Sequence, residues 1–261
     1  MVNFVSVVAA ALIATATVAS AVSMRSEAAG MPDGSWPSSN GDEFFTEPRR
    51  VKKGEVFDGK MKTYQRSDIK CGGQTETGWQ TAVFLVEPGA TLKNVIIGKN
   101  QMDGVHCEQS GCTIENVWWD DVCEDALSIK GGSVNSISKV IGGGARSASD
   151  KIVQHNGLGT VSIEGFYAQD FGKLYRSCGT CGQARKVTVK NVYAVNGRVS
   201  IVTVNQNWGD QATLENIKIK GKKVDVCAWG QGNLSGGEPK EEGAGPSGSL
   251  CKYSPSTISY A

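Results

Sequence analysis

The chain has 261 residues and a formal net charge of +1, from 27 basic and 26 acidic residues. This length is sufficient for one large domain with a substantial core, and single all-β domains of about 200–250 residues are not unusual. The near balance of charge gives no support to nucleic-acid or membrane-surface binding as a property of the whole protein, so any recognition must depend on local charge.

Residues 1–21 are predicted to be a secretory signal peptide. An apolar run is followed by the small-residue pattern Ala19-Ser20-Ala21, as expected at a cleavage site. The run contains much Ala and Thr and is short for a span of about 20 strongly apolar residues, which weighs against a retained membrane anchor. We therefore expect a secreted, extracellular protein that is soluble after cleavage.

Two segments that differ in composition and hydrophobic pattern follow. Residues 22–50 are rich in Ser, Gly, Pro and charge and show no sustained hydrophobic period, so we expect a leader or loosely packed N-terminal cap without chemistry. From residue 51 the chain changes to short apolar alternations interrupted by Gly and Asn, which favours strands over helices. Residues 51–261 are expected to form one domain.

A repeat of alternating segments runs through this domain. Similar segments begin at 91, 113, 135, 160, 187 and 213, and their alignment places at one position Asn94, Asn116, Lys139, Gly165, Asn191 and Asn216, with spacings of 22, 23, 26, 26 and 25 residues. This period matches one turn of a solenoid with stacked parallel coils. Because parallel crossovers are overwhelmingly right-handed, the predicted fold is all-β, a single right-handed parallel β-helix with loop-rich caps. The recurrent Asn residues are expected to be structural, with corner conformations and amide bonds to the next coil.

Eight cysteines follow the predicted cleavage site, at positions 71, 107, 112, 123, 178, 181, 227 and 251. An even number in a secreted chain favours disulfides, whose pairing the sequence does not determine. The alternative is a zinc site on Cys178 and Cys181, or on Cys107 and Cys112, but no second CxxC completes four ligands. Residues 227–261 are predicted to form a loop-rich final cap tied by a disulfide, and they contain the N-glycosylation pattern Asn233-Leu234-Ser235.

Acidic residues dominate the middle of the chain. Glu124 and Asp125 lie 21 and 22 residues after Asp103, which is one coil, so their carboxylates are expected about 5 Å from that of Asp103. Close carboxylates repel unless a hard cation with oxygen ligands lies among them, and Ca²⁺ suits a flexible geometry better than Mg²⁺. The alternative is a solvated acidic face. Asp120 and Asp121 are weaker candidates, because at least one of them should face solvent.

Basic residues repeat the same spacing. Lys151 and Lys173 are 22 residues apart, and Lys173 and Arg176 are close enough for their side chains to converge from a bend. A lysine crowded by cations or a metal loses its proton more readily and can then act as a general base. The alternative is a set of ordinary surface cations.

Two other kinds of residue in this stretch are interpreted as structural. His106 and His155 are suited to base catalysis by residue type, but hydrogen bonding between coils explains both equally well. Trp118 and Trp119 are expected to stack on the body of the coil rather than bind substrate.

The motifs DGVHC, TIENVWWDDVCEDA, GGGARSASDKIVQHNG, DFGKLYRSCGTC and NQNWGDQATL together resemble the family 3 pectate lyases of plant-associated fungi, oomycetes, bacteria and nematodes, over about residues 51–255. The resemblance implies a short right-handed parallel β-helix. It also implies calcium-dependent β-elimination of de-esterified polygalacturonate (pectate).

The resemblance assigns roles to individual residues. It implies that calcium is held by Asp103, Glu124 and Asp125. It implies that the active site is lined by Lys151, Lys173 and Arg176. A Glu in the loop before the first clear coil is also implicated in the family, and Glu76 in GGQTETGW is the nearest match.

The sequence therefore predicts a secreted, monomeric pectate lyase that forms 4,5-unsaturated oligogalacturonides. Lys151 is expected to remove the C5 proton, while Lys173 and Arg176 hold carboxylates or stabilise the developing charge. One alternative is a polygalacturonase-like hydrolase with paired carboxylates, whose GHG and RIK motifs are absent. The other is a non-catalytic β-helix that binds cell walls.

Overall fold

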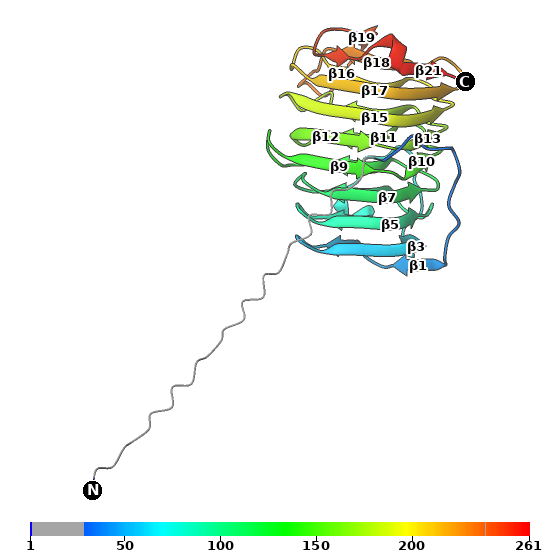
Figure 1. The fold of residues 1–261 in the computed structure, drawn as a ribbon, viewed down its shortest axis with the longest axis vertical. Coiled ribbons are helices and arrows are strands. Elements are labelled where there is room, and N and C mark those ends of the chain that lie inside the picture. The colour runs from blue at the N-terminus through cyan, green and yellow to red at the C-terminus, as the bar shows by residue number, and fades with distance from the viewer. Residues whose placement is uncertain (2–28, 238) are drawn as a thin grey trace.

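The strands stack as parallel coils along one axis, from β1 at one end to β21 at the other (Figure 1). The structure, a computed structural model, describes Met1 and residues 29–237 and 239–261. The expected signal peptide, residues 1–21, lies outside the described residues apart from Met1. The predicted all-β fold, a single parallel β-helix, is confirmed.

Two sheets form the walls of the coil, with nine and twelve strands. The smaller sheet contains β2 (Arg49–Val51), β4 (Ala82–Val86), β6 (Asp103–Cys107), β8 (Asp125–Ile129), β11 (Lys151–His155), β14 (Lys173–Ser177), β16 (Ser200–Asn205), β18 (Asp225–Gly230) and β19 (Glu241–Ala244). All its pairings are parallel except β18 with β19.

The larger sheet is parallel throughout. It contains β1 (Asp42–Phe45), β3 (Val56–Arg66), β5 (Thr91–Ile97), β7 (Thr113–Trp119), β9 (Ile137–Ile141), β10 (Gly144–Arg146), β12 (Gly159–Glu164), β13 (Tyr167–Gln169), β15 (Arg185–Val195), β17 (Gln211–Lys220), β20 (Cys251–Lys252) and β21 (Ile258–Tyr260). Two 3₁₀ turns, η1 (Trp79–Thr81) and η2 (Pro255–Thr257), complete the described elements.

Apolar side chains of both sheets fill the interior. In the smaller sheet the register places one buried residue of each coil in the same row: Val105, Leu127, Val153, Tyr175 and Val202. Because neighbouring coils lie about 4.8 Å apart, these side chains stack on one another and exclude water. In the same strands, the side chains that point to the outer face before and after this row are polar. The candidate site lies among them.

The recurrent asparagines form a ladder at one corner of the coil. Asn94, Asn116, Asn191 and Asn216 all have positive φ, between 50° and 55°. The Asn116 amide donates to Asn94 Oδ1 at 2.9 Å, and the Asn216 amide donates to Asn191 Oδ1 at 2.7 Å. Asn tolerates this left-handed conformation better than most residues, so the predicted structural role is confirmed.

The alignment of Lys139 with this ladder is wrong. Lys139 pairs with Thr113 on β7, three residues before Asn116. The residue before Gly142 pairs with Glu115, the residue before Asn116, so Gly142 occupies the ladder position. Its φ is +65°, and that of Gly165 in the next coil is +68°. Glycine meets the same backbone requirement without a side chain, and apolar alternation alone does not mark it.

The coil begins before residue 51, the boundary expected from the sequence. β1 pairs with β3, and β2 pairs with β4. Upstream of β1, residues 29–41 run along the outside of the larger sheet (Figure 1). Trp36 meets Trp118 edge-on with ring centroids 4.9 Å apart, and the Arg146 guanidinium lies 4.3 Å from the Trp36 centroid. This part of the expected leader is therefore packed against the coil.

Both tryptophans of the WW pair pack on the coil body, as expected. Trp119 is buried inside it, and Trp118 contacts Trp36 and donates to Asn116 Oδ1 at 2.7 Å.

Four disulfides join all eight cysteines: Cys71–Cys123, Cys107–Cys112, Cys178–Cys181 and Cys227–Cys251. The prediction of disulfides is confirmed, and no cysteine remains for zinc. The last bond ties the final cap to β18, as expected. Within the part of the chain that the structure describes, no helix is long and apolar enough to cross a bilayer.

Candidate active site

Four charged residues stand in one row on the outer face of the smaller sheet. Asp103, Asp125, Lys151 and Lys173 are the first residues of β6, β8, β11 and β14, and each pairs with the next in register. The one-coil spacings of Asp103 with Asp125 and of Lys151 with Lys173, read from the sequence, therefore correspond to direct adjacency, and the structure adds the pairing of Asp125 with Lys151. The row changes sign between Asp125 and Lys151, so an acidic half of the site adjoins a basic half.

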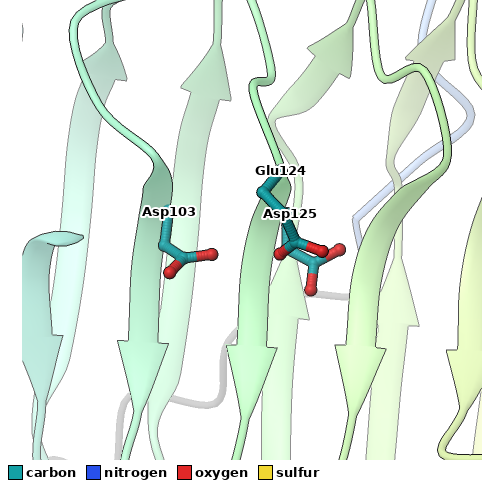
Figure 2. A group of neighbouring side chains, drawn as sticks. All are labelled: Asp103, Glu124 and Asp125. Atoms are coloured by element: carbon teal, nitrogen blue, oxygen red, sulfur yellow. The ribbon is translucent and has the colours of Figure 1, made fainter. Parts of the chain in front are cut away.

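The acidic half is a cluster of three carboxylates. Asp103, Glu124 and Asp125 are 3%, 4% and 3% exposed, and one oxygen of each lies within 4.8 Å of the others. Figure 2 shows Glu124 and Asp125 side by side at the start of one strand and Asp103 on the neighbouring strand. Because all three carboxylates are buried, they do not form the solvated acidic face that was the alternative.

The two other acidic residues of the motif lie apart from this cluster. Asp121 is exposed, and Asp120 forms an ion pair with Arg146 of β10, in the larger sheet. The expectation that they are weaker candidates agrees with this arrangement.

The chemistry of the cluster fits a hard cation. Burial raises the pKa of Glu124, an effect that the charge of Lys151 partly offsets, and burial raises the pKa of Asp125 well above its ordinary value. Asp125 Oδ1 has no hydrogen-bond partner. Lys151 supplies one positive charge beside three buried, crowded carboxylates, so a further cation would lower the cost of their burial. An all-oxygen donor set suits Ca²⁺ or Mg²⁺ rather than zinc.

Lys151 lies at the boundary between the two halves. Its Nζ is 3.2 Å from Glu124 Oε1, 3.7 Å from Asp125 Oδ1 and 3.1 Å from Asp150 Oδ2. Burial alone would lower its pKa, but the charges of these three carboxylates raise it above the ordinary lysine value. The spacing suggested that Lys151 is crowded mainly by cations. In the structure carboxylates surround it instead, and Asp150 lies between Lys151 and Lys173.

The basic half continues along β14. Lys173 Nζ contacts Asp150 Oδ1 at 2.6 Å. Arg176, three residues further on, is 6% exposed and lines the same small cleft as Lys173. Both residues lie within β14, so the bend expected between them is not present. Thr203, Gly230, Pro239, Lys240 and Glu241 complete the lining. An outer face with a buried Arg176, a half-buried Lys173 and an adjoining cleft can hold an anion.

The loop before η1 reaches the acidic cluster. The Cys71–Cys123 disulfide joins it to the residue before Glu124, and Gln74 Nε2 donates to Cys123 O at 2.6 Å. Thr77 Oγ1 donates to Asp103 Oδ2 at 3.1 Å. Glu76 is exposed in this loop, and its charge contributes to the raised pKa of Glu124. Glu76 therefore lies near the acidic cluster.

Among the residues that contact this site, Thr77 and Asp150 were missed from the sequence. Thr77 carries no pattern that would identify it. Asp150 directly precedes Lys151 as Glu124 precedes Asp125, and these pairs lie on adjacent coils in register, so the repeat itself could have revealed it. Burial alone would raise the pKa of Asp150, but its contacts with Lys173 and Lys151 lower it.

The two histidines have different surroundings. His155 is buried, and its Nδ1 lies 2.8 Å from Tyr175 Oη; burial and the charge of Arg185 lower its pKa to about 3, which agrees with a structural role. His106 is also buried, but its Nε2 lies 3.2 Å from Asp103 Oδ2 and its Nδ1 2.9 Å from Glu108 Oε1. Burial would lower the pKa of His106, and these two carboxylates raise it. His106 thus supports one member of the acidic cluster.

Comparison with known proteins gives matches over most of the chain. Residues 33–235 match the model of the protein family described as Pectate lyase. Among similar proteins, "Pectate lyase E" of Emericella nidulans is 52% identical over 220 residues, which are 84% of this chain and 84% of that protein. "Probable pectate lyase D" of Aspergillus fumigatus is 49% identical over 220 residues, 84% of this chain and 88% of that protein.

Solved structures with the same fold include the catalytic domain of pectate lyase PelI from Erwinia chrysanthemi. Its TM-score is 0.66 with 30% identity, over 85% of this chain and 98% of that chain. The same enzyme in complex with tetragalacturonic acid has a TM-score of 0.64 with 30% identity, over 85% of this chain and 71% of that chain.

Proposed function

Because the chain belongs to the pectate lyase family and is a pectate lyase, we propose that it cleaves de-esterified polygalacturonate by calcium-dependent β-elimination and releases 4,5-unsaturated oligogalacturonides. The observation that carries this proposal is the register of Asp125 with Lys151, which brings three buried carboxylates beside a lysine. The PelI complex with tetragalacturonic acid supports a polygalacturonate substrate. The motifs of the chain support its assignment to family 3.

In this proposal Asp103, Glu124 and Asp125 hold the calcium ion. Bound there, calcium supplies electron withdrawal from a uronate carboxylate, which makes the proton on the adjacent C5 more acidic. Thr77 and His106 keep the Asp103 carboxylate in place through their contacts with it. Glu76 adds a further negative charge at this end of the site.

Lys151 is the proposed base. Its amine takes the proton from C5, the electron pair of the C5–H bond forms the C4–C5 double bond, and the C4–O bond breaks. The departing oxygen takes a proton from solvent, and no water is added to the sugar. Lys151 can accept the proton only in its neutral form, so the charges of Glu124 and Asp125, which hold its own proton, must be neutralised first.

Lys173 and Arg176 are the proposed anion-binding residues. Both line the cleft beside Lys151, where an ammonium and a guanidinium can hold uronate carboxylates. They can also stabilise the negative charge that develops on the reacting carboxylate.

Incubation of the purified protein with polygalacturonate and calcium, followed by ultraviolet absorbance, tests this function. Only elimination creates a conjugated double bond. A hydrolase would release new reducing ends without absorbance, and a cell-wall binding protein would do neither.

The proposed setting is extracellular, with a monomeric enzyme that acts on cell-wall pectin. The apolar leader at residues 1–21 supports export through cleavage near Ala21, and residues 51–261 would form most of the enzymatic domain. Four disulfides are consistent with an oxidising compartment.

A further inference from the structure

Asp150 lies between two lysines that would otherwise repel. Its Oδ2 is 3.1 Å from Lys151 Nζ, and its Oδ1 is 2.6 Å from Lys173 Nζ. Lys151 and Lys173 are register partners on adjacent strands, so their ammonium groups start from neighbouring positions. At such separations like charges repel appreciably. One carboxylate with an oxygen for each lysine offsets this repulsion and fixes both ends.

The backbone that carries Asp150 is itself held from several sides. Arg198 Nη2 donates to Ala148 O at 2.8 Å and to Ser149 O at 2.7 Å. The Lys173 amide donates to Asp150 O at 2.6 Å. Gly172 passes so close that a Cβ there would lie 2.3 Å from Asp150 O. The direction of the Asp150 carboxylate is therefore set by the fold rather than by a mobile side chain alone.

We propose that Asp150 is a positioning residue that holds the amines of Lys151 and Lys173 at a fixed separation and in different directions. One amine then faces the C5 proton, and the other faces a substrate carboxylate. The inference rests on the proposed function of these lysines. It does not require Asp150 to touch the substrate, and it assigns the residue a role in turnover through its neighbours.

A double-mutant cycle tests the role of Asp150. We expect Asp150→Ala to lower kcat about 10- to 100-fold, because small displacements of catalytic groups have effects of this size, while KM changes less. In a Lys173→Met background the same substitution should have a much smaller effect, because residues that act together are not additive. Asp150→Asn keeps the shape and should lie between wild type and Asp150→Ala.

The matched control is Asp120→Asn, which removes a partly exposed carboxylate directly after β7 that is ion-paired with Arg146. It should leave kcat and KM unchanged. Additive effects of Asp150 and Lys173, or near-normal kcat in Asp150→Asn and Asp150→Ala with unchanged circular dichroism, would overturn the inference. A wild-type protein that forms no unsaturated product would instead refute the proposed function.

An independent feature is the glycosylation pattern in the loop between β18 and β19. Asn233-Leu234-Ser235 is the only such pattern in the 261 residues. All three residues are exposed, Leu234 to 75%. The Asn233 amide N–H donates to Gly179 O at 2.8 Å, and Ser235 N donates to Asn233 Oδ1 at 2.9 Å. The loop is thus anchored by its backbone while the Asn233 side chain remains accessible.

The geometry points to Asn233 as a site of N-linked glycosylation, an inference that rests on the proposed secretion. Asn233 Nδ2 would bond to the anomeric carbon of a lipid-linked oligosaccharide diphosphate; the sugar C1–O bond breaks, and the lipid diphosphate and one amide proton leave. Gly179, to which Asn233 is bonded, lies three residues beyond Arg176. The glycan would therefore stand beside the cleft lined by Lys173 and Arg176.

Secretion by a yeast host, followed by intact mass before and after peptide:N-glycosidase F, tests this site. We expect one glycan on the wild type and on Ser235→Thr, and none on Asn233→Gln or Ser235→Ala. The glycan should also raise KM for long polygalacturonate more than for a trimer. Secreted wild type without a glycan, or a glycan that persists in Asn233→Gln, would overturn the inference, whereas failure of export would count against the proposed secretion.

Discussion

Asp125 and Lys151 occupy the same register position on β8 and β11, with Asp125 Oδ1 3.7 Å from Lys151 Nζ. This pair joins the acidic and the basic half of the site. A cation bound by the carboxylates and a proton held by the lysine therefore compete for the same negative charge. Metal binding and the protonation of Lys151 should therefore be coupled.

Removal of calcium should abolish activity, and added calcium should restore it. Asp125→Asn should raise the calcium requirement, because it removes one charge from a buried three-carboxylate site. Calcium at about 100 times its Kd should also stabilise the wild type by about 2.7 kcal/mol, which thermal unfolding can detect independently of activity. Asp121→Asn, on an exposed side chain outside the cluster, is the control. Full activity in excess chelator would refute calcium dependence.

The asparagine ladder should contribute to stability but not to turnover. Asn116→Ala places a residue with a Cβ but no polar side chain at a φ of 50° and removes the bonds to Asn94 and Trp118. We expect a loss of about 1–3 kcal/mol in the free energy of unfolding, measured by urea titration. Asn116→Gly keeps the backbone conformation accessible and should lose less. An equal loss in both variants would contradict the conformational argument.

The fold could be predicted because its signal is local and repeated. An apolar alternation every 22–26 residues specifies both the strand and the length of the coil, and motifs one coil apart become neighbours in the structure. The same logic paired Asp103 with Asp125 and Lys151 with Lys173, but the adjacency of Asp125 and Lys151 was recognised only in the structure. The alignment failed at Lys139, because either Asn or Gly satisfies the corner conformation and alternation does not distinguish their position.

What could not be predicted depends on contacts between distant segments. The packing of residues 29–41 depends on Trp36 meeting Trp118, more than eighty residues away along the chain. The bridge from Asp150 to both lysines depends on Arg198 and Gly172, which hold its turn. The disulfide pairing likewise could not be predicted, because eight cysteines allow 105 connectivities. The geometry of the coil determines which pairs meet.

Acid should destabilise the protein partly through His155. Its pKa is lowered to about 3 by burial, so between about pH 6.5 and 3 the unfolded chain binds a proton that the folded chain does not. The stability contribution is complete above pH 6.5 and is lost as the pH falls through this window. His155→Gln should therefore show a smaller decrease in Tm between pH 7 and pH 4, measured in excess chelator. An unchanged pH dependence would show that His155 is not a source of acid lability.

If Lys151 is the base, activity should depend on the loss of its proton. Glu124, Asp125 and Asp150 raise its pKa, so at neutral pH it holds its proton, and each unit of pH below the pKa reduces the neutral fraction tenfold. Calcium that neutralises the charges of Glu124 and Asp125 makes the loss of the Lys151 proton easier, but Lys151 still holds its proton at neutral pH. Activity at saturating calcium should therefore climb as the pH rises into the alkaline range. A kcat that declines steadily from neutral pH, with the fold intact, would argue against a lysine base.

Substitution at Lys151 should reduce turnover while substrate binding persists. Lys151→Ala should lower kcat by about 10²- to 10⁴-fold, the usual contribution of a positioned general base. Lys151→Arg should not restore it, because a guanidinium holds its proton far more firmly. Lys173→Ala and Arg176→Ala should raise KM as well as lower kcat, since both residues line the cleft. If Lys151→Ala retained near-normal turnover while Arg176→Ala were inactive, Arg176 would replace Lys151 as the base.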